Sequence, residues 1–535
     1  MSPDNLRMLI GFALILVILI LWQMFLPGHR QTGSKMAPAP ESIPSPSPTE
    51  TAVVWQEASQ IKSAIPLAET TITLENEFLR VQFTSQGGGL KSCSLKKYQV
   101  QLVPENGVLL KTVELNGVSY QNLQVSDTSV AFSYQLPEGT VVKTWTIEKD
   151  YTLRLNLLLT DSREGRTEGV KEPSFTFDVQ DGIAITEENR KEDLANFHFY
   201  ARKERSVHQV AVGNLRKKPL VIPAPDWAGV KSKYFFLALV SEEGEFDSTQ
   251  AFALSDGRVG FIARGHFQSE TLTPRRFLVY LGPIEYNRLR AFGLGFENVV
   301  SLGWLKPIAL GILYLLRLFY QLVRNWGWAI VLFSGVMKGV FYPLTRTQTR
   351  QMRQLQLLQP KIEELKQKYK DDPKMLNQET MRLYQLYKVN PFSGCLPLIV
   401  QMPVFFALYA VLRNFIELRG AGFILWLKDL SQPDTLFGHI PQGVPLIGGF
   451  AIGLLPVLMG VSFIGQNLLT STDRRNRAMT FFFPIFITAI FLNLSSGLQL
   501  YWFIYNILSI GESLIATKGG KLWLKLKKSP MRGVR

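Results

Sequence analysis

The sequence has few of the residues that build disulfide frameworks and metal sites. It contains two cysteines, Cys93 and Cys395, so a disulfide framework and a cysteine-rich metal site are both excluded. The five histidines are scattered, and none lies at helical spacing from another or within an H-E-x-x-H pattern. We therefore expect no metal, no cofactor and no catalytic residue set.

The sequence has fewer acidic than basic residues. The 535 residues include 58 Lys and Arg against 43 Asp and Glu, a formal charge of +15, and 46% of them are hydrophobic. A chain of this length and apolar content has several domains and more apolar sequence than one soluble core needs. Because the apolar residues gather in long runs, the sequence indicates a polytopic membrane protein.

The first apolar run predicts a membrane anchor. It extends from Leu6 to Leu26, about long enough as a helix to cross a hydrocarbon core of roughly 30 Å. Pro27 and Gly28 follow without a small-residue cleavage site, which favours an anchor (residues 1–27) over a cleaved signal peptide. Residues 28–55 are rich in Pro and Ser and are predicted to be a flexible linker.

Residues 56–285 have the sequence pattern of a β domain. Apolar and polar residues alternate with period two in Thr71–Phe83 and Val141–Leu159, which predicts a large, mostly antiparallel β structure. The run Gly87–Gly89 lacks the Lys-Ser/Thr of a phosphate loop and is predicted to be a turn between strands.

Five later apolar runs predict further membrane-spanning helices: Trp328–Leu344, Leu396–Phe415, Val444–Leu469, Phe481–Leu494 and Leu498–Ile515. Lys and Arg concentrate after the first of these, at Arg474–Arg477, and in the tail (residues 517–535). Basic loops mark the cytoplasmic side, so both termini are predicted to be cytoplasmic and the β domain to lie outside.

Residues 286–327 connect the β domain to these spans. Within them, Gly303–Val323 is apolar enough to be a seventh span, which would move the β domain to the cytoplasm. Lys306, Arg317 and Arg324 fall on one face at 100° per residue, so we predict instead a helix lying in the membrane surface.

Residues 346–390 predict a cytoplasmic helical hairpin. Apolar residues recur at coiled-coil spacing on both sides of a turn at Asp371–Pro373. The positions that define it are Leu355, Leu358, Ile362, Leu365 and Pro373. Its outer face and the tail are basic, which suits either a solvated, orientation-setting surface or contact with anionic lipid or ribosomal RNA.

Lys338 is the principal candidate site residue. It lies in the middle of the span Trp328–Leu344, eight residues from Arg346, or on the order of 12 Å along a helix. A lone ammonium at that depth costs about 2.5 to 3.5 kcal/mol, so Lys338 is expected to face water or a partner. The alternative is a pair with a carboxylate of the bundle, for which Glu512 is the candidate.

Uncharged polar residues occur in the same spans. Each alone is typical of helix packing or of an interfacial aromatic, but together with Lys338 they would line a water-filled cavity. They are Ser334, Gln401, Tyr501, Trp502 and Asn506, with Gln499 beside them.

Four stretches resemble the YidC/Oxa family of membrane protein insertases. They are VMKGVFYPLT (Val336–Thr345), LQPKI (Leu358–Ile362), KVNPFSGCLPLIVQMPVFFALY (Lys388–Tyr409) and SSGLQLYWFIYN (Ser495–Asn506). The resemblance implies a bacterial inner-membrane protein with a five-helix core (residues 328–516) around a hydrophilic groove. It also implies a periplasmic β-sandwich of the Gram-negative type.

The resemblance also assigns groove positions. Lys338 stands where the family usually has an arginine, which keeps the charge but loses the guanidinium fork. Ser334 replaces a threonine, Gln401 matches a glutamine, and Tyr501 with Trp502 matches a tyrosine pair.

The implied function is insertion of nascent membrane proteins, alone or with the Sec translocon. The ribosome and membrane lipids are the other expected partners. No covalent chemistry and no small-molecule substrate are expected. The main alternative is an ion or small-solute transporter, but the spans show no inverted repeat. A sugar-active β domain is another alternative, but no suitable set of His and carboxylates is evident there.

Overall fold

The computed structural model describes residues 69–113, 122–136, 139–161, 174–244, 246–267, 274–387, 389, 396–441, 443–444, 448–470 and 482–527. The predicted anchor and linker lie outside these residues, as does the end of the basic tail. The chain divides into two compact units, with the boundary between Val300 and Ser301.

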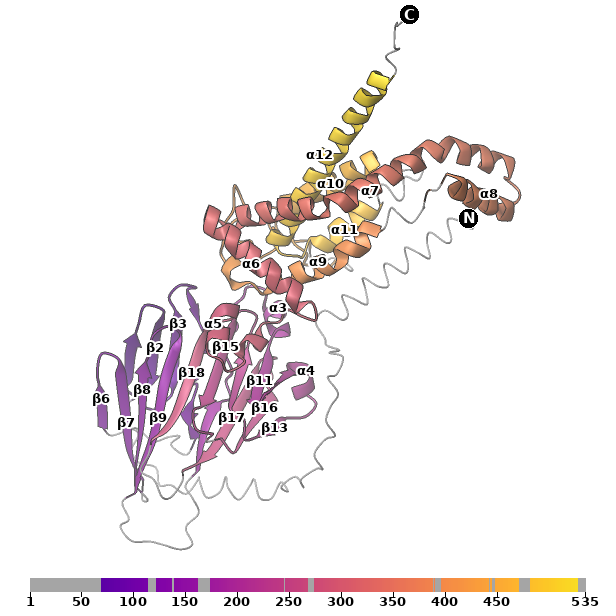
Figure 1. Ribbon diagram of the computed structural model, residues 1–535. Helices are drawn as coiled ribbons and strands as arrows, with labels where there is room; N and C mark the ends of the chain where they lie inside the picture. Colours follow the sequence, from indigo (N-terminus) through magenta and orange to yellow (C-terminus); the bar gives the residue numbers. More distant parts are fainter. Residues whose placement is uncertain are drawn as a thin grey trace, which may run out of the picture. The chain divides into compact units, whose positions relative to one another are not determined.

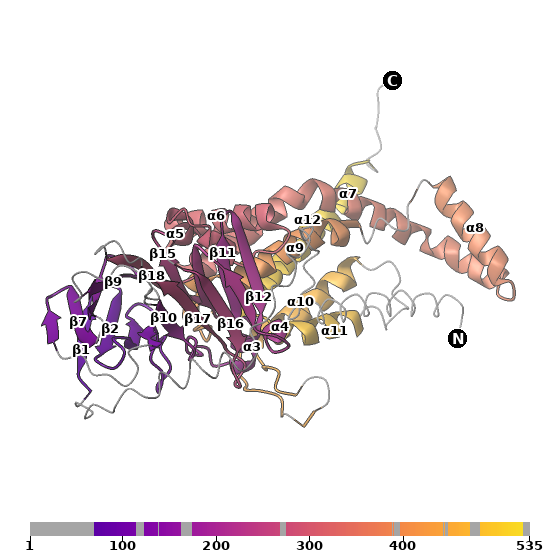
Figure 2. The same cartoon turned by 90° about the horizontal axis from the view of Figure 1, so that it is seen from below.

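Unit 1 is a sandwich of antiparallel β-sheets, in agreement with the alternation in its sequence (Figures 1 and 2). One layer is a nine-stranded sheet in the order β12 (Ser206–Ala211), β11 (His198–Lys203), β14 (Trp227–Lys231), β15 (Phe235–Ser241), β18 (Arg275–Pro283), β9 (Thr152–Asp161), β8 (Gly139–Ile147), β7 (Ser129–Leu136) and β6 (Asn122–Val125).

The second layer of the sandwich consists of two smaller sheets. One has the order β1 (Thr71–Glu75), β2 (Leu79–Thr84), β3 (Leu90–Leu95), β4 (Val100–Gln101), and the other β13 (Leu220–Pro223), β16 (Ser248–Ala253), β17 (Val259–His266), β10 (Ser174–Val179), β5 (Lys111–Thr112). Aromatic rings join the layers, with centroids 4.9 Å apart for Phe177 and Phe277 and 5.5 Å apart for Phe83 and Trp145.

A buried lysine ties the nine-stranded sheet to both smaller sheets. Inward-facing positions alternate along β8, and Lys143 occupies one of them beside Trp145, with no exposed surface. Its Nζ donates to the carbonyls of Gly87 (3.2 Å) and Leu110 (2.7 Å) and to Thr112 Oγ1 (3.1 Å). Gly87 belongs to the predicted turn between β2 and β3, where it adopts a left-handed conformation (φ 63°).

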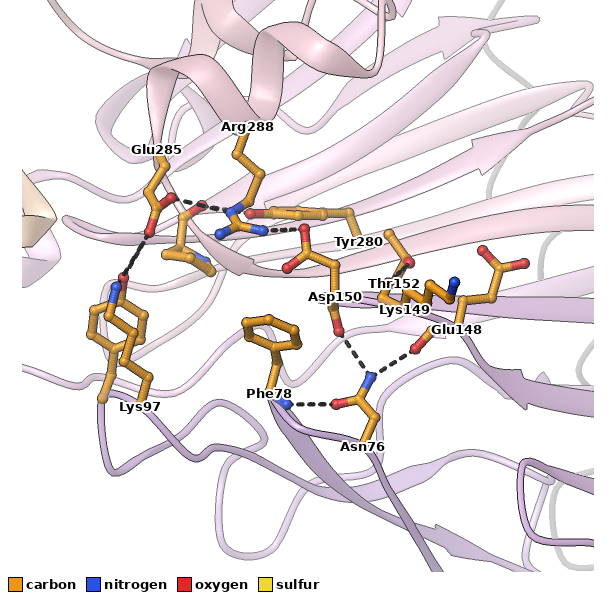
Figure 3. A network of polar contacts seen from close by, with 12 residues as sticks. Asn76, Phe78, Lys97, Glu148, Lys149, Asp150, Thr152, Tyr280, Glu285 and Arg288 are labelled. Atoms are coloured by element: carbon orange, nitrogen blue, oxygen red, sulfur yellow. Dashed lines mark hydrogen bonds and ion pairs between the residues drawn. The ribbon is translucent and has the colours of Figure 1, made fainter.

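A second polar network fixes α5 (Tyr286–Ala291) to the sandwich (Figure 3). Arg288 of α5 forms ion pairs with Asp150 and, at 3.2 Å, with Glu285. The backbone oxygen of Asp150 in turn accepts from Asn76 Nδ2 at 3.0 Å. Tyr98 Oη donates to Glu285 at 2.8 Å, so turns of both layers hold α5.

Short helices complete unit 1. They are α3 (Arg190–Ala195), α4 (Val212–Leu215) and the 3-10 turn η2 (Phe296–Val299). Asp193 of α3 is buried, and burial is the main cause that raises the pKa of its carboxyl, although it accepts backbone N–H groups of Thr186 and Lys233. The ring of Trp227 in β14 lies 4.9 Å from that of Phe296, which packs η2 onto the nine-stranded sheet.

Unit 2 is helical. Its elements are α6 (Lys306–Val323), α7 (Trp326–Lys368), α8 (Pro373–Leu386), α9 (Leu396–Asn414), η4 (Ile416–Leu418), α10 (Leu454–Thr470), α11 (Phe483–Phe491) and α12 (Ser496–Lys527). Helix α12 packs against α7, α9 and α10, while α6 packs against α7 and α9. The long α7 ends at the turn into α8 (Figure 1).

One predicted boundary in unit 2 is wrong, and one junction is continuous. The predicted span Trp328–Leu344 and the first arm of the predicted hairpin lie in one helix of 43 residues, α7, with Pro343 and Pro360 inside it. The span predicted from Val444 begins only at Leu454. Gly449 is left-handed (φ 81°), and the Asp434 carboxylate accepts the backbone N–H of Leu455 at 2.8 Å, which sets the start of α10.

We expect Lys143→Met to lower the free energy of unfolding by about 1–3 kcal/mol, because three buried acceptors lose their donor. Thr144→Val is the matched control, since Thr144 lies next to Lys143 on the opposite, half-buried face of β8. Urea unfolding of the solubilised protein, followed by protease resistance of the β domain, measures both. Equal midpoints for the two variants would contradict a role for the ammonium in joining the layers.

Candidate functional site

Lys338 lies against a polar stripe of α12. Its Nζ forms an ion pair with Glu512 Oε2 at 2.7 Å and donates to Ser509 Oγ at 2.8 Å. The ammonium also lies 5.1 Å from the centroid of the Tyr505 ring, a distance at which the ring quadrupole attracts a cation. The side chains of Lys338 and Glu512 are 12% and 17% exposed, so the pair is largely withdrawn from solvent.

The expectation of an ammonium that faces water without an acidic partner is therefore wrong. The alternative, a pair with Glu512, is the arrangement in the structure. Glu512 lies about three helical turns C-terminal to Tyr501 on α12. The Lys338 side chain is long enough to reach it from α7. The Glu512 carboxylate offsets part of the cost of withdrawing the ammonium from water.

Gln401 and Tyr501 form a second polar contact. Gln401 Nε2 of α9 donates to Tyr501 Oη of α12 at 2.9 Å, and both side chains are buried. The neighbouring Trp502 packs edge-on between Phe405 (5.8 Å) and Phe491 (5.9 Å). Its indole Nε1 is buried and has no hydrogen-bond partner among the residues that the structure describes.

Asn506 and Ser334 do not join these contacts. Asn506 Nδ2 donates to Ser462 Oγ of α10 at 3.2 Å. Ser334 Oγ donates to the Ile330 carbonyl of its own helix at 2.7 Å, so its hydroxyl is not turned to Lys338. Gln401 and Tyr501 are thus the two predicted residues that hydrogen-bond each other, while the Tyr505 ring lies close to both Lys338 (5.1 Å) and Tyr501 (5.9 Å). That the six residues line one groove stays a prediction.

Sequence reasoning left out part of the Lys338 site, although a signal was present. Tyr501, Tyr505, Ser509 and Glu512 follow one another at spacings of four, four and three residues, which places them on one face of a helix. That stripe predicts a polar face of α12. Its partner on α7 cannot be read from the spacing, because the pairing depends on how the two helices pack.

The predicted hairpin has its own small core. Leu355, Leu358 and Ile362 of α7 pack with Val389 and with the partly buried Leu383 and Tyr384. Leu365 is half-buried, and Pro373 is the first residue of α8, where the Asp372 carboxylate accepts the N–H groups of Lys374 and Met375.

The charge pattern of α6 differs from the prediction at one residue. Arg317 forms an ion pair with Glu417 of η4 at 2.6 Å, and the two side chains are 23% and 16% exposed. Arg317 is therefore neutralised within the unit and does not extend a solvated face with Lys306 and Arg324. The placement of α6 in the membrane surface stays a prediction.

Two described helices, Lys306–Val323 and Trp326–Gln351, are long and apolar enough to cross a membrane, and Leu454–Leu468 is a shorter apolar helix. Within the same part of the chain, no group of three His, Cys, Asp or Glu is placed to hold a metal ion. A β-sandwich followed in sequence by apolar helices with internally paired polar groups defines a class, an integral membrane protein with a large extramembranous domain.

Comparison with known proteins narrows this class. Residues 318–522 match the family model described as "60Kd inner membrane protein", and residues 114–315 match "YidC periplasmic domain". The membrane protein insertase YidC of Pelobacter propionicus is 33% identical over 486 residues, which cover 84% of this chain and 86% of that relative. That of Syntrophus aciditrophicus is 31% identical over 520 residues, covering 90% and 91%.

A crystal structure of an active YidC insertase with its first transmembrane domain resolved also matches, with 19% identity, a TM-score of 0.39, and coverage of 87% of this chain and 98% of that one. The chain belongs to the YidC family of membrane protein insertases. It is a membrane protein with a periplasmic domain, and the prediction of an insertase rather than an enzyme is confirmed.

We expect Tyr501→Phe to destabilise the helical unit by about 0.5–1.5 kcal/mol, because the buried Gln401 amide loses its acceptor. A double-mutant cycle with Gln401→Leu, read from thermal unfolding in detergent, isolates this coupling. The matched control is Tyr505→Phe, which should show no coupling to Gln401. Equal coupling for both tyrosines would show that the Gln401 contact contributes nothing specific.

Proposed function

We propose that this insertase receives a nascent membrane protein along α9 and α12, while a short polar flank of the client rests beside Lys338. The proposal rests above all on the ion pair of Lys338 with Glu512, a charge held deep in an apolar helical unit. Intramembrane ionisable residues of this kind mark functional sites more often than structural ones. The predicted groove residues Lys338, Ser334, Gln401, Tyr501, Trp502 and Asn506 would be arranged around this path.

In this proposal Glu512 is an exchangeable partner of Lys338, and the neighbouring contacts support this role. If the carboxylate withdraws, the ammonium keeps Ser509 and the face of Tyr505, and Glu512 keeps the Thr345 hydroxyl, which donates to it at 3.3 Å. Neither charge is then left without a polar neighbour, which lowers the cost of separating them. A carboxylate in the client flank would take the place of Glu512 on Lys338.

Trp502 supports a client path beside α9 and α12. Its buried Nε1–H has no acceptor among the described residues, and it lies within a cluster of aromatic rings. An unpaired donor in an apolar environment is costly, and a backbone carbonyl of a client helix near its end would satisfy it. Trp502 would therefore contact the client through its indole N–H, while its ring packs against Phe405 and Phe491.

The arrangement in the membrane follows from the basic segments. We place α7, α9, α10, α11 and α12 across the membrane as the five-helix core (residues 328–516), and α6 in the membrane surface within the connecting residues 286–327. The hairpin (346–390) and tail (517–535) lie in the cytoplasm, as does the N-terminus that precedes the anchor 1–27 and linker 28–55. The β-sandwich (56–285) lies in the periplasm.

The hairpin is the proposed contact for the ribosome and for anionic lipid. Its cations Lys361, Lys366, Lys368, Lys374 and Arg382 are all exposed. Such a surface attracts phosphate groups of either partner. The Sec translocon is a proposed partner for those clients that need it.

The client path is tested by crosslinking. A photoreactive group at Gln401 or Trp502 should capture the apolar segment of a ribosome-bound, single-span nascent chain, whereas one at Val461, an exposed position of α10, should not. Equal capture at all three positions would argue against a path along α9 and α12.

The charge exchange is tested by the insertion rate of single-span clients into vesicles. For a client with an acidic translocated flank, we expect Lys338→Ala to lower the rate about tenfold, equivalent to ~1.4 kcal/mol. We expect Lys338→Arg to preserve it and Glu512→Gln to raise it several-fold, because the ammonium no longer has an internal competitor.

The matched control is Glu417→Gln, which removes a carboxylate that is also ion-paired and is 16% exposed, close to the 17% of Glu512. A client with an uncharged flank should be insensitive to Glu512→Gln. If Glu512→Gln and Glu417→Gln have the same effect on the acidic client, Glu512 is a structural partner only and the exchange is excluded.

A further inference from the structure

The loop between α9 and α10 contains a tight turn whose tip is apolar and exposed. The turn spans Phe423–Leu427 and is closed by backbone hydrogen bonds from Phe423 N to Leu427 O (2.8 Å) and from Leu427 N to Ile424 O (3.2 Å). At its tip, Leu425 is 84% exposed and Ile424 is 45% exposed. Leu425 also adopts a left-handed conformation (φ 56°), which is rare and costly for a bulky side chain.

The turn is seated firmly on the first turn of α7. The Phe423 ring lies directly over Gly327, where a Cβ would come within 2.0 Å of it, and packs edge-on against Trp328 at 5.3 Å. Asn325, the N-cap residue of α7, donates through Nδ2 to the Gly422 carbonyl at 3.2 Å. The left-handed Leu425 is thus held in place by its surroundings, and its depth is that of the start of α7.

An exposed apolar stripe of α7 begins at this point. Trp328, Leu332, Val336 and Val340 follow one another at four-residue spacing and are 48%, 36%, 41% and 61% exposed. On a helix long and apolar enough to cross a membrane, such a stripe faces the acyl chains. Through the contact of Phe423 with Trp328, the turn continues this stripe beyond the end of the helix.

We propose that the Phe423–Leu427 turn inserts into the lipid leaflet at the N-terminal end of α7, with Ile424 and Leu425 at the boundary between headgroups and acyl chains. The exposed Lys428 follows directly and suits the phosphates of the headgroups, while Trp328 and Trp426 have the amphipathic rings typical of this depth. The turn would fix the depth of α7, the helix that carries Lys338. This inference does not depend on the client path proposed above.

The test measures the depth of a spin label in vesicles of phosphatidylcholine and phosphatidylglycerol that contain no other protein. The variants are Leu425→Cys and, independently, Ile424→Cys, each in a Cys395→Ser background. Cys93 is fully buried, and burial raises the pKa of its thiol, so it does not take the label. Both test side chains are exposed in the structure, so labelling leaves the packing intact.

Two labelled references bracket the result. Val336→Cys lies within the apolar stripe and reports lipid. Glu204→Cys reports water and matches Leu425, since Glu204 is an exposed, left-handed residue (φ 55°) in the turn between β11 and β12 of the periplasmic domain. We expect labels at 425 and 424 to collide with oxygen more than with a water-soluble nickel chelate, as at 336. Nickel accessibility closer to that at 204 for both positions would overturn the proposal.

Discussion

A charge withdrawn from water inside an apolar environment must find a partner, and this constraint organises both units of the protein. In the helical unit the ammonium of Lys338 is held by the Glu512 carboxylate at 2.7 Å, together with a hydroxyl and an aromatic face. The pair joins α7 to α12. The packing of the two helices therefore depends on this contact, and the proposed exchange with a client would act on the same pair.

The β-sandwich also contains a buried ammonium, that of Lys143, and here hydrogen bonds to neutral oxygens stabilise it. Lys143 is buried without any exposed surface, and three neutral oxygen acceptors surround its ammonium. Two of these are main-chain carbonyls fixed by turns, so they cannot leave as a side-chain carboxylate can. Lys143 therefore joins the layers of the sandwich through fixed acceptors, whereas the partner of Lys338 is a side-chain carboxylate, which the proposed function treats as exchangeable.

Neutral polar groups of the helical unit follow the same rule. Gln401 bonds Tyr501, Asn506 bonds Ser462, and Ser334 bonds its own helix. The first two contacts hold α9, α10 and α12 together, as polar side chains do between membrane helices. Trp502 departs from this rule, because its buried N–H has no partner among the described residues, and the same holds for Ser431 Oγ and Gln499 Oε1.

Composition and periodicity determined the two-part plan, because alternation along β8 and long apolar runs such as that of α7 are local properties of the chain. The motifs around Lys338 and Tyr501 were enough to indicate the family. Local sequence did not determine which residue forms an ion pair with Lys338 or where α10 begins. It also did not determine that the Ser334 hydroxyl donates to its own helix. Those outcomes depend on contacts between residues far apart in the chain, such as Lys338 with Glu512 and Asp434 with Leu455, and only the packing of the helices brings these together.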